Sequence, residues 1–291
     1  MTTQGVIYYA TGTKYVEQML VSAESLKQHT DLPVTVYSDE QIHSQYIDNV
    51  VVITPGEHPF YDRINYFKQT PYDKTLYLDT DTYIAGDVSP IFEMLDRFDV
   101  VAAFNESRDT AAPHTKFDTV DLDVPPSFPE YQCGVIGYQN TEPIQQLFDD
   151  WQTRYKPYRD KHLIDQPHFR EALYNSNLAI GTLPSEYNTL ANFGGYLHEY
   201  VRLLHYAGSN KKRLGCGTPD ADTLQEFVDV LNEDAPKDRV FYYDSARCLQ
   251  VTPTTQNLTL YHGVVQSVRR DGIWSTIKKT VAKIKQLHST Y

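Results

Sequence analysis

The hydrophobic positions at the start of the chain change from a continuous run to the spacing of a helix. Residues 5–11, GVIYYAT, form an apolar run of strand length, and Gly12 and Thr13 follow as a turn. From Tyr15 onward the apolar residues recur three or four positions apart, as on one face of a helix. These positions are Val16, Met19, Leu20, Ala23 and Leu26. Basic residues and then Pro33 predict the end of this helix within KQHTDLP.

The alternation of strands and helices continues through the first half of the chain. Strands are predicted for the segments PVTVYSD, NVVVIT, KTLYLDTD and VVAAFNE, which are rich in β-branched and aromatic residues. Residues 61–70 are predicted to be helical. A third helix, SPIFEMLDRF, is expected to begin with Ser89 as its N-cap and Pro90 at its first position.

The second half begins with a loop that is rich in Pro, Asp and Thr, over residues 109–130. CGVIGY then predicts a strand, and Thr141 is expected to cap a helix. The apolar face of that helix comprises Ile144, Leu147, Phe148, Trp151 and Tyr155. HLIDQPHFREALYNS is expected to be helical on both sides of Pro167, and VRLLHYAG is strand-like. The whole pattern predicts an α/β fold with a mostly parallel central sheet flanked by helices.

Two acidic residues, Asp79 and Asp81, follow a predicted buried strand at the place where open α/β sheets bind ligands. Two carboxylates one residue apart can approach one hard cation, such as Mg²⁺ or Mn²⁺, that also takes phosphate oxygens. Such an ion would neutralise a departing diphosphate. The alternative is a solvated turn in which one of the aspartates caps the next element.

Composition describes an ordinary globular chain. It has 291 residues, 41% of them hydrophobic, a mean hydropathy of −0.49 and no apolar run long enough to span a bilayer. Cys133, Cys216 and Cys248 fit neither a zinc site nor a disulfide framework. The N-terminus lacks the basic and apolar segments of a secretory signal, so we expect a cytoplasmic protein.

Charge is distributed unevenly. The net charge of −12 argues against nucleic-acid binding. Residues 268–291 hold six basic side chains and one acidic one, for a net charge of +5, which leaves −17 on the rest. Apolar residues recur in this tail at helical spacing, namely Ile273, Trp274, Ile277, Val281 and Ile284. The tail is therefore either an amphipathic helix on an anionic membrane surface, at the inner membrane face, or a helix docked on the domain.

Six segments in order resemble the family 8 glycosyltransferases, which include glycogenin and galactosyltransferases of lipopolysaccharide synthesis. They span about residues 5–211 and read YATGTKYVEQMLVSAESLKQH, YFKQTPYDKTLYLD, LYLDTDTYIAGDVSPIF, CGVIGYQN, DQPHF and HYAGSNK. The resemblance implies the GT-A fold. It also implies metal-dependent transfer of a hexose from a UDP-sugar, with retention at the anomeric carbon, to a glycan, lipid-linked or protein acceptor.

The same resemblance implies roles for residues that match the family's motifs. Ala10, Thr11 and Tyr15 match positions that hold the uracil, with Tyr15 as a stacking ring or, alternatively, a core aromatic. Lys68 matches a lysine that reaches the nucleotide-sugar; its alternative is a solvated helix lysine.

Three further matches form the implied metal site. Asp79 and Asp81 match the metal-binding aspartates, with Asp81 as the more direct ligand, and His205 matches the third ligand. An imidazole suits Mn²⁺ better than an all-oxygen site would. His262, in LYHGVV, is a rival that lacks a lysine at the matching offset.

The remaining matches concern the diphosphate and the reacting sugar. Gly208 permits close backbone approach and Lys211 places a positive charge on the diphosphate. Asp165 and Gln166 flank the reacting sugar: Asp165 binds hydroxyls or caps a helix, and Gln166 acts weakly as a nucleophile or orients the sugar. Because an amide is a poor nucleophile, we favour front-face attack assisted by the diphosphate.

The chain departs from the family at two places. Gln132, Cys133 and Gly134 stand where members commonly show Asn-Ser-Gly, and KKRLG stands where Pro-Trp often follows the late lysine. Two other functions stay open: a sugar nucleotidyltransferase, for which ATGTKY is a poor phosphate loop, and a non-catalytic nucleotide-sugar-binding protein.

We expect one catalytic domain over residues 1–267, followed by the basic tail over 268–291. The domain is expected to comprise a nucleotide-binding half (about 1–88), an acceptor half (about 89–211) and a C-terminal extension (212–267).

Overall fold

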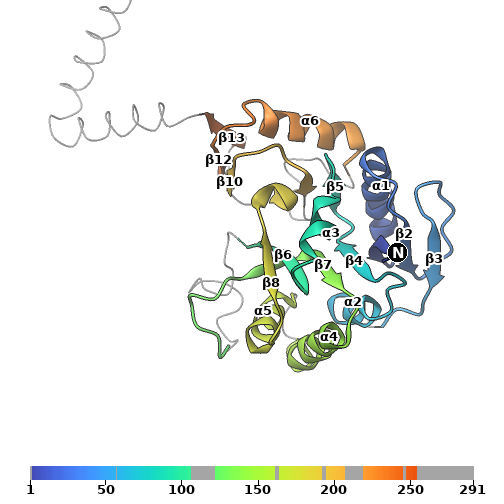
Figure 1. Cartoon of the computed structure of the whole chain (residues 1–291). Coiled ribbons are helices and arrows are strands. Elements are labelled where there is room, and N and C mark those ends of the chain that lie inside the picture. Colours follow the sequence, from blue (N-terminus) through green and yellow to red (C-terminus); the bar gives the residue numbers. More distant parts are fainter. Residues whose placement is uncertain are drawn as a thin grey trace, which may run out of the picture.

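A seven-stranded sheet forms the centre of the computed structural model, which describes residues 2–56, 58–105, 122–160, 164–191, 195–206, 219–244 and 247–253 (Figure 1). Its strands are β1 (Gln4–Ala10), β2 (Val34–Ser38), β3 (Asn49–Val52), β4 (Lys74–Leu78), β6 (Val100–Phe104), β7 (Tyr131–Gln139) and β8 (Ile180–Leu183). Their spatial order is β3-β2-β1-β4-β7-β6-β8. All neighbours are parallel except at β7, which is antiparallel to both β4 and β6. The predicted mostly parallel α/β sheet is therefore confirmed.

The reversed direction of β7 decides what meets at the ligand-binding edge. Because β7 runs against β4, its first residues lie beside the carboxyl end of β4. Leu78 pairs with Val135, and the Asp79 amide donates a hydrogen bond of 2.8 Å to the Gly134 carbonyl. Gly134 and its neighbours are thereby fixed next to the aspartate pair.

Helices cover both faces of the sheet (Figure 1). The helices α1 (Thr13–His29) and α3 (Pro90–Met94) pack on one face, and α2 (Pro59–Phe67), α4 (Glu142–Tyr155) and α5 (Gln166–Asn175) pack on the other. Alternate residues of β1 enter the two cores, Val6 and Tyr8 on the α1 side and Ile7 and Tyr9 on the α2 side. Burial on both faces explains why this strand is an unbroken apolar run.

Two short three-stranded sheets lie beyond the central one. One has the order β5-β11-β9, formed by β5 (Thr82–Ile84), β11 (Leu203–His205) and β9 (Thr189–Leu190), the last preceded by the 3₁₀ turn Ser185–Tyr187. The other has the order β10-β12-β13, formed by β10 (Gly195–Leu197), β12 (Arg239–Asp244) and β13 (Arg247–Pro253).

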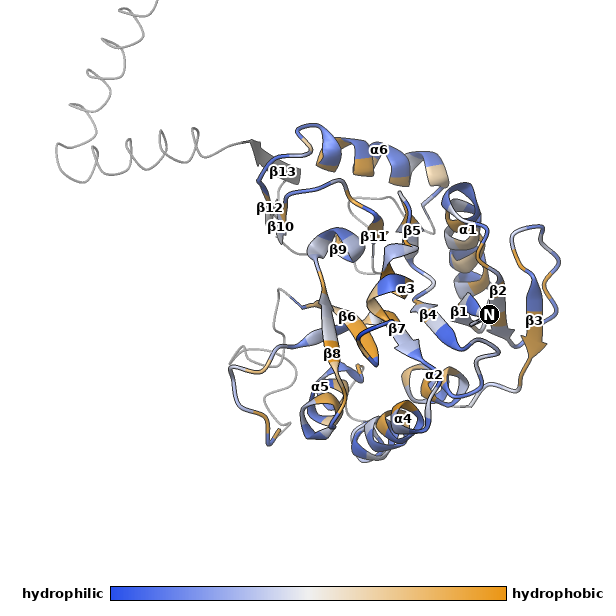
Figure 2. Cartoon of the chain, viewed as in Figure 1, coloured by the Kyte–Doolittle hydropathy of each residue, from blue (hydrophilic) through white to orange (hydrophobic). Residues whose placement is uncertain are grey.

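The helix α6 (Ala221–Asn232) covers the third core, where its Leu224, Val228 and Leu231 join Leu204 and Tyr206. Figure 2 shows hydrophilic and hydrophobic residues side by side on this helix, as expected for one with a single buried face. None of the helices in the described ranges combines the length and apolar character needed to cross a membrane.

Helix ends differ from the predictions in three places. Ser89 occupies the N-cap position of α3 but makes no capping bond, because its backbone is helical (φ −57°, ψ −30°) and not extended as a capping residue requires; its hydroxyl donates to Asp87 Oδ2 at 2.8 Å. Thr141 likewise precedes α4 without a side-chain cap. The helix α5 begins at Gln166, so Pro167 lies in its first turn and residues 164–165 before it are not helical, as the missing proline N–H favours.

Candidate active site

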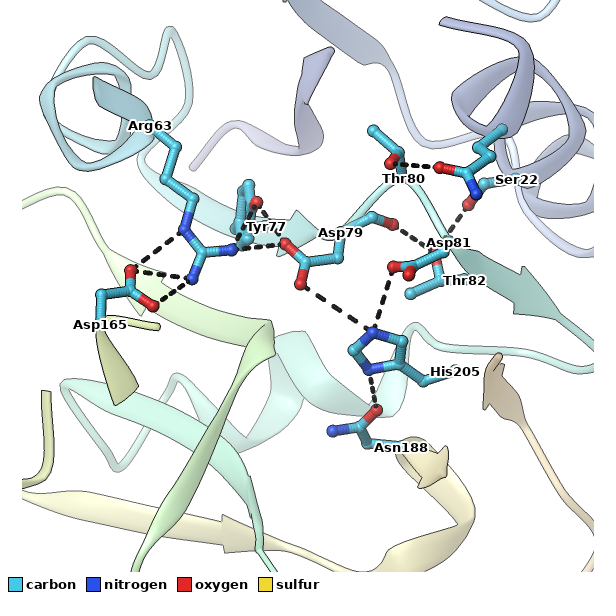
Figure 3. Close-up of polar contacts among 11 residues, drawn as sticks. Ser22, Arg63, Tyr77, Asp79, Thr80, Asp81, Thr82, Asp165, Asn188 and His205 are labelled. Carbon is cyan, nitrogen blue, oxygen red and sulfur yellow. Dashed lines mark hydrogen bonds and ion pairs between the residues drawn. The ribbon is translucent and has the colours of Figure 1, made fainter. Parts of the chain in front are cut away.

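The turn that carries Asp79 and Asp81 is held from beneath by buried hydroxyl groups. The Thr82 hydroxyl donates to the Asp79 carbonyl at 2.8 Å and lies 2.7 Å from the Ser22 hydroxyl of α1. Ser22 in turn lies 2.9 Å from the Tyr8 hydroxyl of β1. The aspartates therefore project from a turn whose backbone is fixed to both the sheet and α1 (Figure 3).

His205 reaches the aspartates through the pairing of β11 with β5. That pairing is antiparallel and sets His205 opposite Thr82, while the Tyr206 amide donates to the Asp81 carbonyl at 3.0 Å. The His205 Nε2 atom lies 3.2 Å from Asp81 Oδ1 and 3.9 Å from Asp79 Oδ2 (Figure 3). One ligand atom from each of the three residues lies within 4.8 Å of the others.

The orientation of the imidazole is set by Asn188. Its amide oxygen lies 3.0 Å from His205 Nδ1, and because an amide oxygen only accepts, Nδ1 carries the hydrogen. Nε2 then faces the two carboxylates, where it can donate a proton to Asp81 or, in the neutral ring, offer its lone pair to a cation. Burial opposes the charged imidazole, but Asp81 and Asp79 outweigh it, so the pKa of His205 is raised.

This donor set fits a divalent cation. Nε2 and two carboxylates that face one point need positive charge among them, which a proton on the imidazole or a bound cation can supply. Two carboxylates and one imidazole, with the second ring nitrogen bonded to an outer residue, are suitable ligands for Mn²⁺ and less so for Mg²⁺.

A buried arginine, Arg63 of α2, joins the two acidic parts of the site. Its Nη1 lies 2.7 Å from Asp79 Oδ1, and its Nη2 lies 2.8 and 2.9 Å from the two carboxylate oxygens of Asp165 (Figure 3). Tyr77 donates to the same Asp79 oxygen at 2.5 Å. Although burial disfavours the cation, Asp165 and Asp79 help to raise the pKa of Arg63 well above its ordinary value, so it stays charged.

Asp165 and Gln166 lie at the start of α5. Asp165 is 1% exposed, and its carboxylate contacts Arg63 instead of capping the helix. Its carbonyl accepts a hydrogen bond of 3.0 Å from the Trp151 indole. Gln166 donates from Nε2 to Glu130 Oε1 at 2.6 Å.

These groups line one cleft of about 390 Å³. Besides the three candidate metal ligands, Arg63, Asp165 and Gln166, its walls include Thr11, Lys14 and Tyr15 at the start of α1 and the three residues Gln132–Gly134 of β7. Lys14 Nζ lies 5.0 Å from the centre of the Tyr15 ring, which is 45% exposed. Ala10 is fully buried behind this wall. Burial raises the pKa of the Cys133 thiol well above its ordinary value, so Cys133 is neutral here.

The structure does not bring Lys68 to the cleft. Its ammonium lies 2.5 Å from Asp149 Oδ1 of α4, and it is not among the lining residues. Five helical positions separate it from Arg63, a rotation of about 140° that turns Lys68 away from the cleft. Gly208, Lys211 and His262 lie outside the described residues.

Sequence reasoning missed Arg63, Glu130 and Asn188. Arg63 could have been found, because it is in phase with Ile64 and Phe67, the buried positions of its helix, and a charged side chain on a buried face requires a partner. Nothing comparable marks Asn188, whose contact with His205 depends on the pairing of β9 with β11.

Comparison with known proteins agrees with this geometry. The profile of Glycosyl transferase family 8 matches residues 56–212, more than half of the chain. No curated protein sequence matches the chain.

Several solved structures share its fold. The galactosyltransferase LgtC, solved with donor and acceptor sugar analogues, is 14% identical, covers 78% of this chain and 95% of its own, and gives a TM-score of 0.56. The bifunctional glycosyltransferase WbbM is 14% identical over 78% of this chain and 50% of its own, with a TM-score of 0.53. GlyE of Streptococcus pneumoniae TIGR4 is 15% identical over 78% of this chain and 61% of its own, also with a TM-score of 0.53. At these identities the likeness is one of fold, the GT-A fold.

Proposed function

The chain belongs to glycosyl transferase family 8, and from that premise we propose that it transfers a hexose from a UDP-sugar, in a metal-dependent reaction that retains the anomeric configuration. The acceptor would be a carbohydrate, a glycolipid or a protein. The observation that carries the proposal is the convergence of Asp79, Asp81 and His205 at the carboxyl end of β4. Of the three functions that the sequence left open, family membership favours this one over the nucleotidyltransferase and the non-catalytic protein.

Asp79, Asp81 and His205 would hold one Mn²⁺ or Mg²⁺ ion, with Mn²⁺ favoured by the imidazole. When bound, the ion would act as a Lewis acid on the diphosphate and make it a better leaving group. Asn188 would keep the imidazole in the tautomer that offers Nε2. Gly208 and Lys211 stay predictions for the diphosphate, since they lie outside the described residues.

The start of α1 would bind the nucleotide. Tyr15 offers an exposed ring face for the uracil, and Thr11 and Lys14 add polar groups beside it, with Ala10 behind them.

The donor sugar would lie between this end of the cleft and α5. Asp165 would accept hydrogen bonds from sugar hydroxyls with the lone pairs that Arg63 leaves free. Arg63 would balance the charges of Asp79 and Asp165, so that both carboxylates keep their positions when the donor enters. Gln166 would lie beside the reacting carbon.

Retention requires that the acceptor hydroxyl attack the anomeric carbon on the face from which UDP leaves. The new bond forms between the acceptor oxygen and the anomeric carbon as the bond from that carbon to the diphosphate oxygen breaks. The acceptor proton passes to the departing diphosphate. Gln166 would supply an amide dipole to the positive charge at the sugar and not a covalent bond, because an amide is a poor nucleophile.

Hydrolysis of a panel of UDP-sugars, with Mn²⁺ and with EDTA, tests the proposal. We expect one UDP-hexose to be turned over only with the metal, and Asp81→Asn to abolish that turnover while Asp87→Asn, outside the cleft, preserves it. Proton NMR of the first product should show the donor's anomeric configuration. Metal-independent turnover, or an inverted product, would contradict the proposal.

We also propose the domain division given above and membrane contact through residues 268–291, which lie outside the described residues. In the full chain, glutamine substitution of four tail lysines should abolish co-sedimentation with phosphatidylglycerol vesicles and leave donor hydrolysis intact. These are Lys278, Lys279, Lys283 and Lys285. Unchanged vesicle binding would favour a docked helix.

A further inference from the structure

A network of buried polar side chains lies behind the sugar end of the cleft. It consists of Asn105 after β6, Glu130 before β7, Gln132 in β7 and Gln166 at the start of α5. Their exposures are 0%, 2%, 8% and 7%. Neither Glu130 nor Asn105 lines the cleft, whereas both glutamines do. The network therefore connects the protein interior to two groups that a ligand can touch.

Each hydrogen bond of the network is donated toward Glu130, either directly or through Asn105. Glu130 Oε1 accepts from Gln166 Nε2 at 2.6 Å and from Asn105 Nδ2 at 2.7 Å. Asn105 Oδ1 then accepts from Gln132 Nε2 at 2.6 Å. The backbone N–H of Asn105 also donates to the backbone carbonyl of Glu130 at 2.7 Å, which fixes the two main-chain segments that carry these side chains.

The chemistry of a carboxylate decides this direction. An ionised carboxylate only accepts, so the NH₂ groups of Gln166 and Asn105 must both face Glu130. Since Asn105 has then used its NH₂ group, it offers its carbonyl to Gln132. One acid thus sets the orientation of three amides that could otherwise be rotated by 180° with little change in shape. The carbonyl oxygens of Gln132 and Gln166 are the amide ends that this network leaves uncommitted.

We propose that Glu130 is a positioning residue for sugar transfer, which holds the carbonyl oxygens of Gln166 and Gln132 toward the donor sugar. The inference rests on the proposed function. Acceptor oxygens at these positions select sugar hydroxyls that donate. They also place the negative ends of two fixed dipoles beside the carbon that becomes positive as UDP leaves. With a neutral residue at 130, either amide could turn and present its NH₂ group, which would oppose that charge.

The cost of burying Glu130 supports a role beyond folding. A buried carboxylate loses its hydration, and its hydrogen bonds, those from Gln166 and Asn105 among them, must compensate for that loss. A fold alone could place an amide or an apolar group there. An obligate acceptor at this position fixes the orientation of both amides, which an amide or an apolar group would not do.

Glu130→Gln tests the role in catalysis, with Glu186→Gln as its matched control. Glu186 is another buried acid, 7% exposed, that accepts hydrogen bonds from the backbone amides of His198 and Glu199 away from the cleft. For UDP-glucose or UDP-galactose hydrolysis with Mn²⁺, we expect Glu130→Gln to lower kcat by about 10- to 100-fold, with KM and the affinity for UDP within about twofold. Glu186→Gln should leave kcat unchanged. A wild-type kcat for Glu130→Gln, or an equal loss in both variants, would overturn the inference.

A second readout does not depend on activity. In ¹⁵N NMR spectra, the NH₂ signals of Gln166 and Asn105 should exchange slowly with water in the wild type and lose that protection in Glu130→Gln. If no UDP-sugar is turned over, the proposed function fails, but protected NH₂ signals in the wild type would still support the orientation of the amides. Unchanged protection in Glu130→Gln would overturn the inference that Glu130 sets this orientation. If Glu130→Gln does not fold, Glu130→Asp replaces it as the test. This variant keeps the charge but shortens the side chain by one methylene, so we expect a smaller loss of kcat. A wild-type kcat in Glu130→Asp would contradict the positioning role.

Discussion

Replacing Gly134 with alanine would place a methyl group inside the candidate metal site. The Cβ atom would lie 2.3 Å from His205 Cε1 and 2.9 Å from Asp79 Oδ2, whereas ordinary contact begins at 3.4 Å. Strand β7 cannot retreat easily, because Gly134 accepts the hydrogen bond of the Asp79 amide. The imidazole would therefore have to move by about 1 Å, far more than the roughly 0.2 Å that metal–ligand distances tolerate.

The linkage between Mn²⁺ binding and folding gives the size of the expected loss of stabilisation in Gly134→Ala. At an Mn²⁺ concentration of 100 times the dissociation constant, the wild type gains about 2.7 kcal/mol in unfolding free energy. Displacing one ligand by this distance should weaken binding by at least the roughly 10- to 100-fold seen for outer-residue substitutions. The gain would then fall to between about 1.4 and 0.4 kcal/mol.

Urea denaturation with and without Mn²⁺ measures this gain, and Gly137→Ala is the control. Gly137 belongs to the same strand, and its added Cβ would lie 2.6 Å from Val101 Cγ2 in the core, away from the cleft. Gly137→Ala should lose about 1–3 kcal/mol of stability through overpacking and keep the full Mn²⁺ gain. A Gly134→Ala protein that keeps the wild-type gain would refute the reasoning.

Four other substitutions test separate parts of the site. Arg63→Met should cost about 3–5 kcal/mol of stability in urea denaturation and abolish turnover, because it leaves two carboxylates uncompensated; stability near that of the wild type would disprove the bridging role. Asn188→Ala should weaken Mn²⁺ binding about 10- to 100-fold in calorimetry, and an unaltered affinity would show that the imidazole needs no support. Tyr15→Ala should weaken UDP binding by about 1–3 kcal/mol, whereas Tyr200→Ala, another exposed tyrosine, should have no effect; equal affinities would exclude stacking. Lys68→Ala should leave the KM for donor within about twofold, since its ammonium contacts Asp149, and a large rise would place it back at the donor.

Those strands and helices that have a clear local pattern of hydrophobic residues could be predicted from the sequence. β1 could be recognised because it is an apolar run of strand length, and α1 because it is long and strongly periodic. The antiparallel direction of β7 could not be predicted, because an apolar run does not show whether the strand lies parallel or antiparallel to its neighbours. The prediction of a capping bond from Ser89 was wrong because residue type does not show that its backbone is already helical.

In the site, too, features set by nearby residues could be predicted and features set by long-range contacts could not. Asp79 and Asp81 lie in one turn, so their pairing is visible in the sequence. His205 joined them only through its match to the family motif, because its position depends on a short strand pairing across more than a hundred residues. Arg63 could have been recognised as a charged residue on a buried helix face, but its partners, like those of Glu130, belong to distant elements, and residue type alone does not reveal such contacts.

Anomalous X-ray diffraction above the manganese edge, from crystals grown with MnCl₂ and UDP, tests the central claim most directly. We expect one strong peak within coordinating distance of Asp79 or Asp81 and of His205 Nε2, next to the UDP diphosphate. A peak away from these side chains, or bound UDP without a peak among them, would contradict the account.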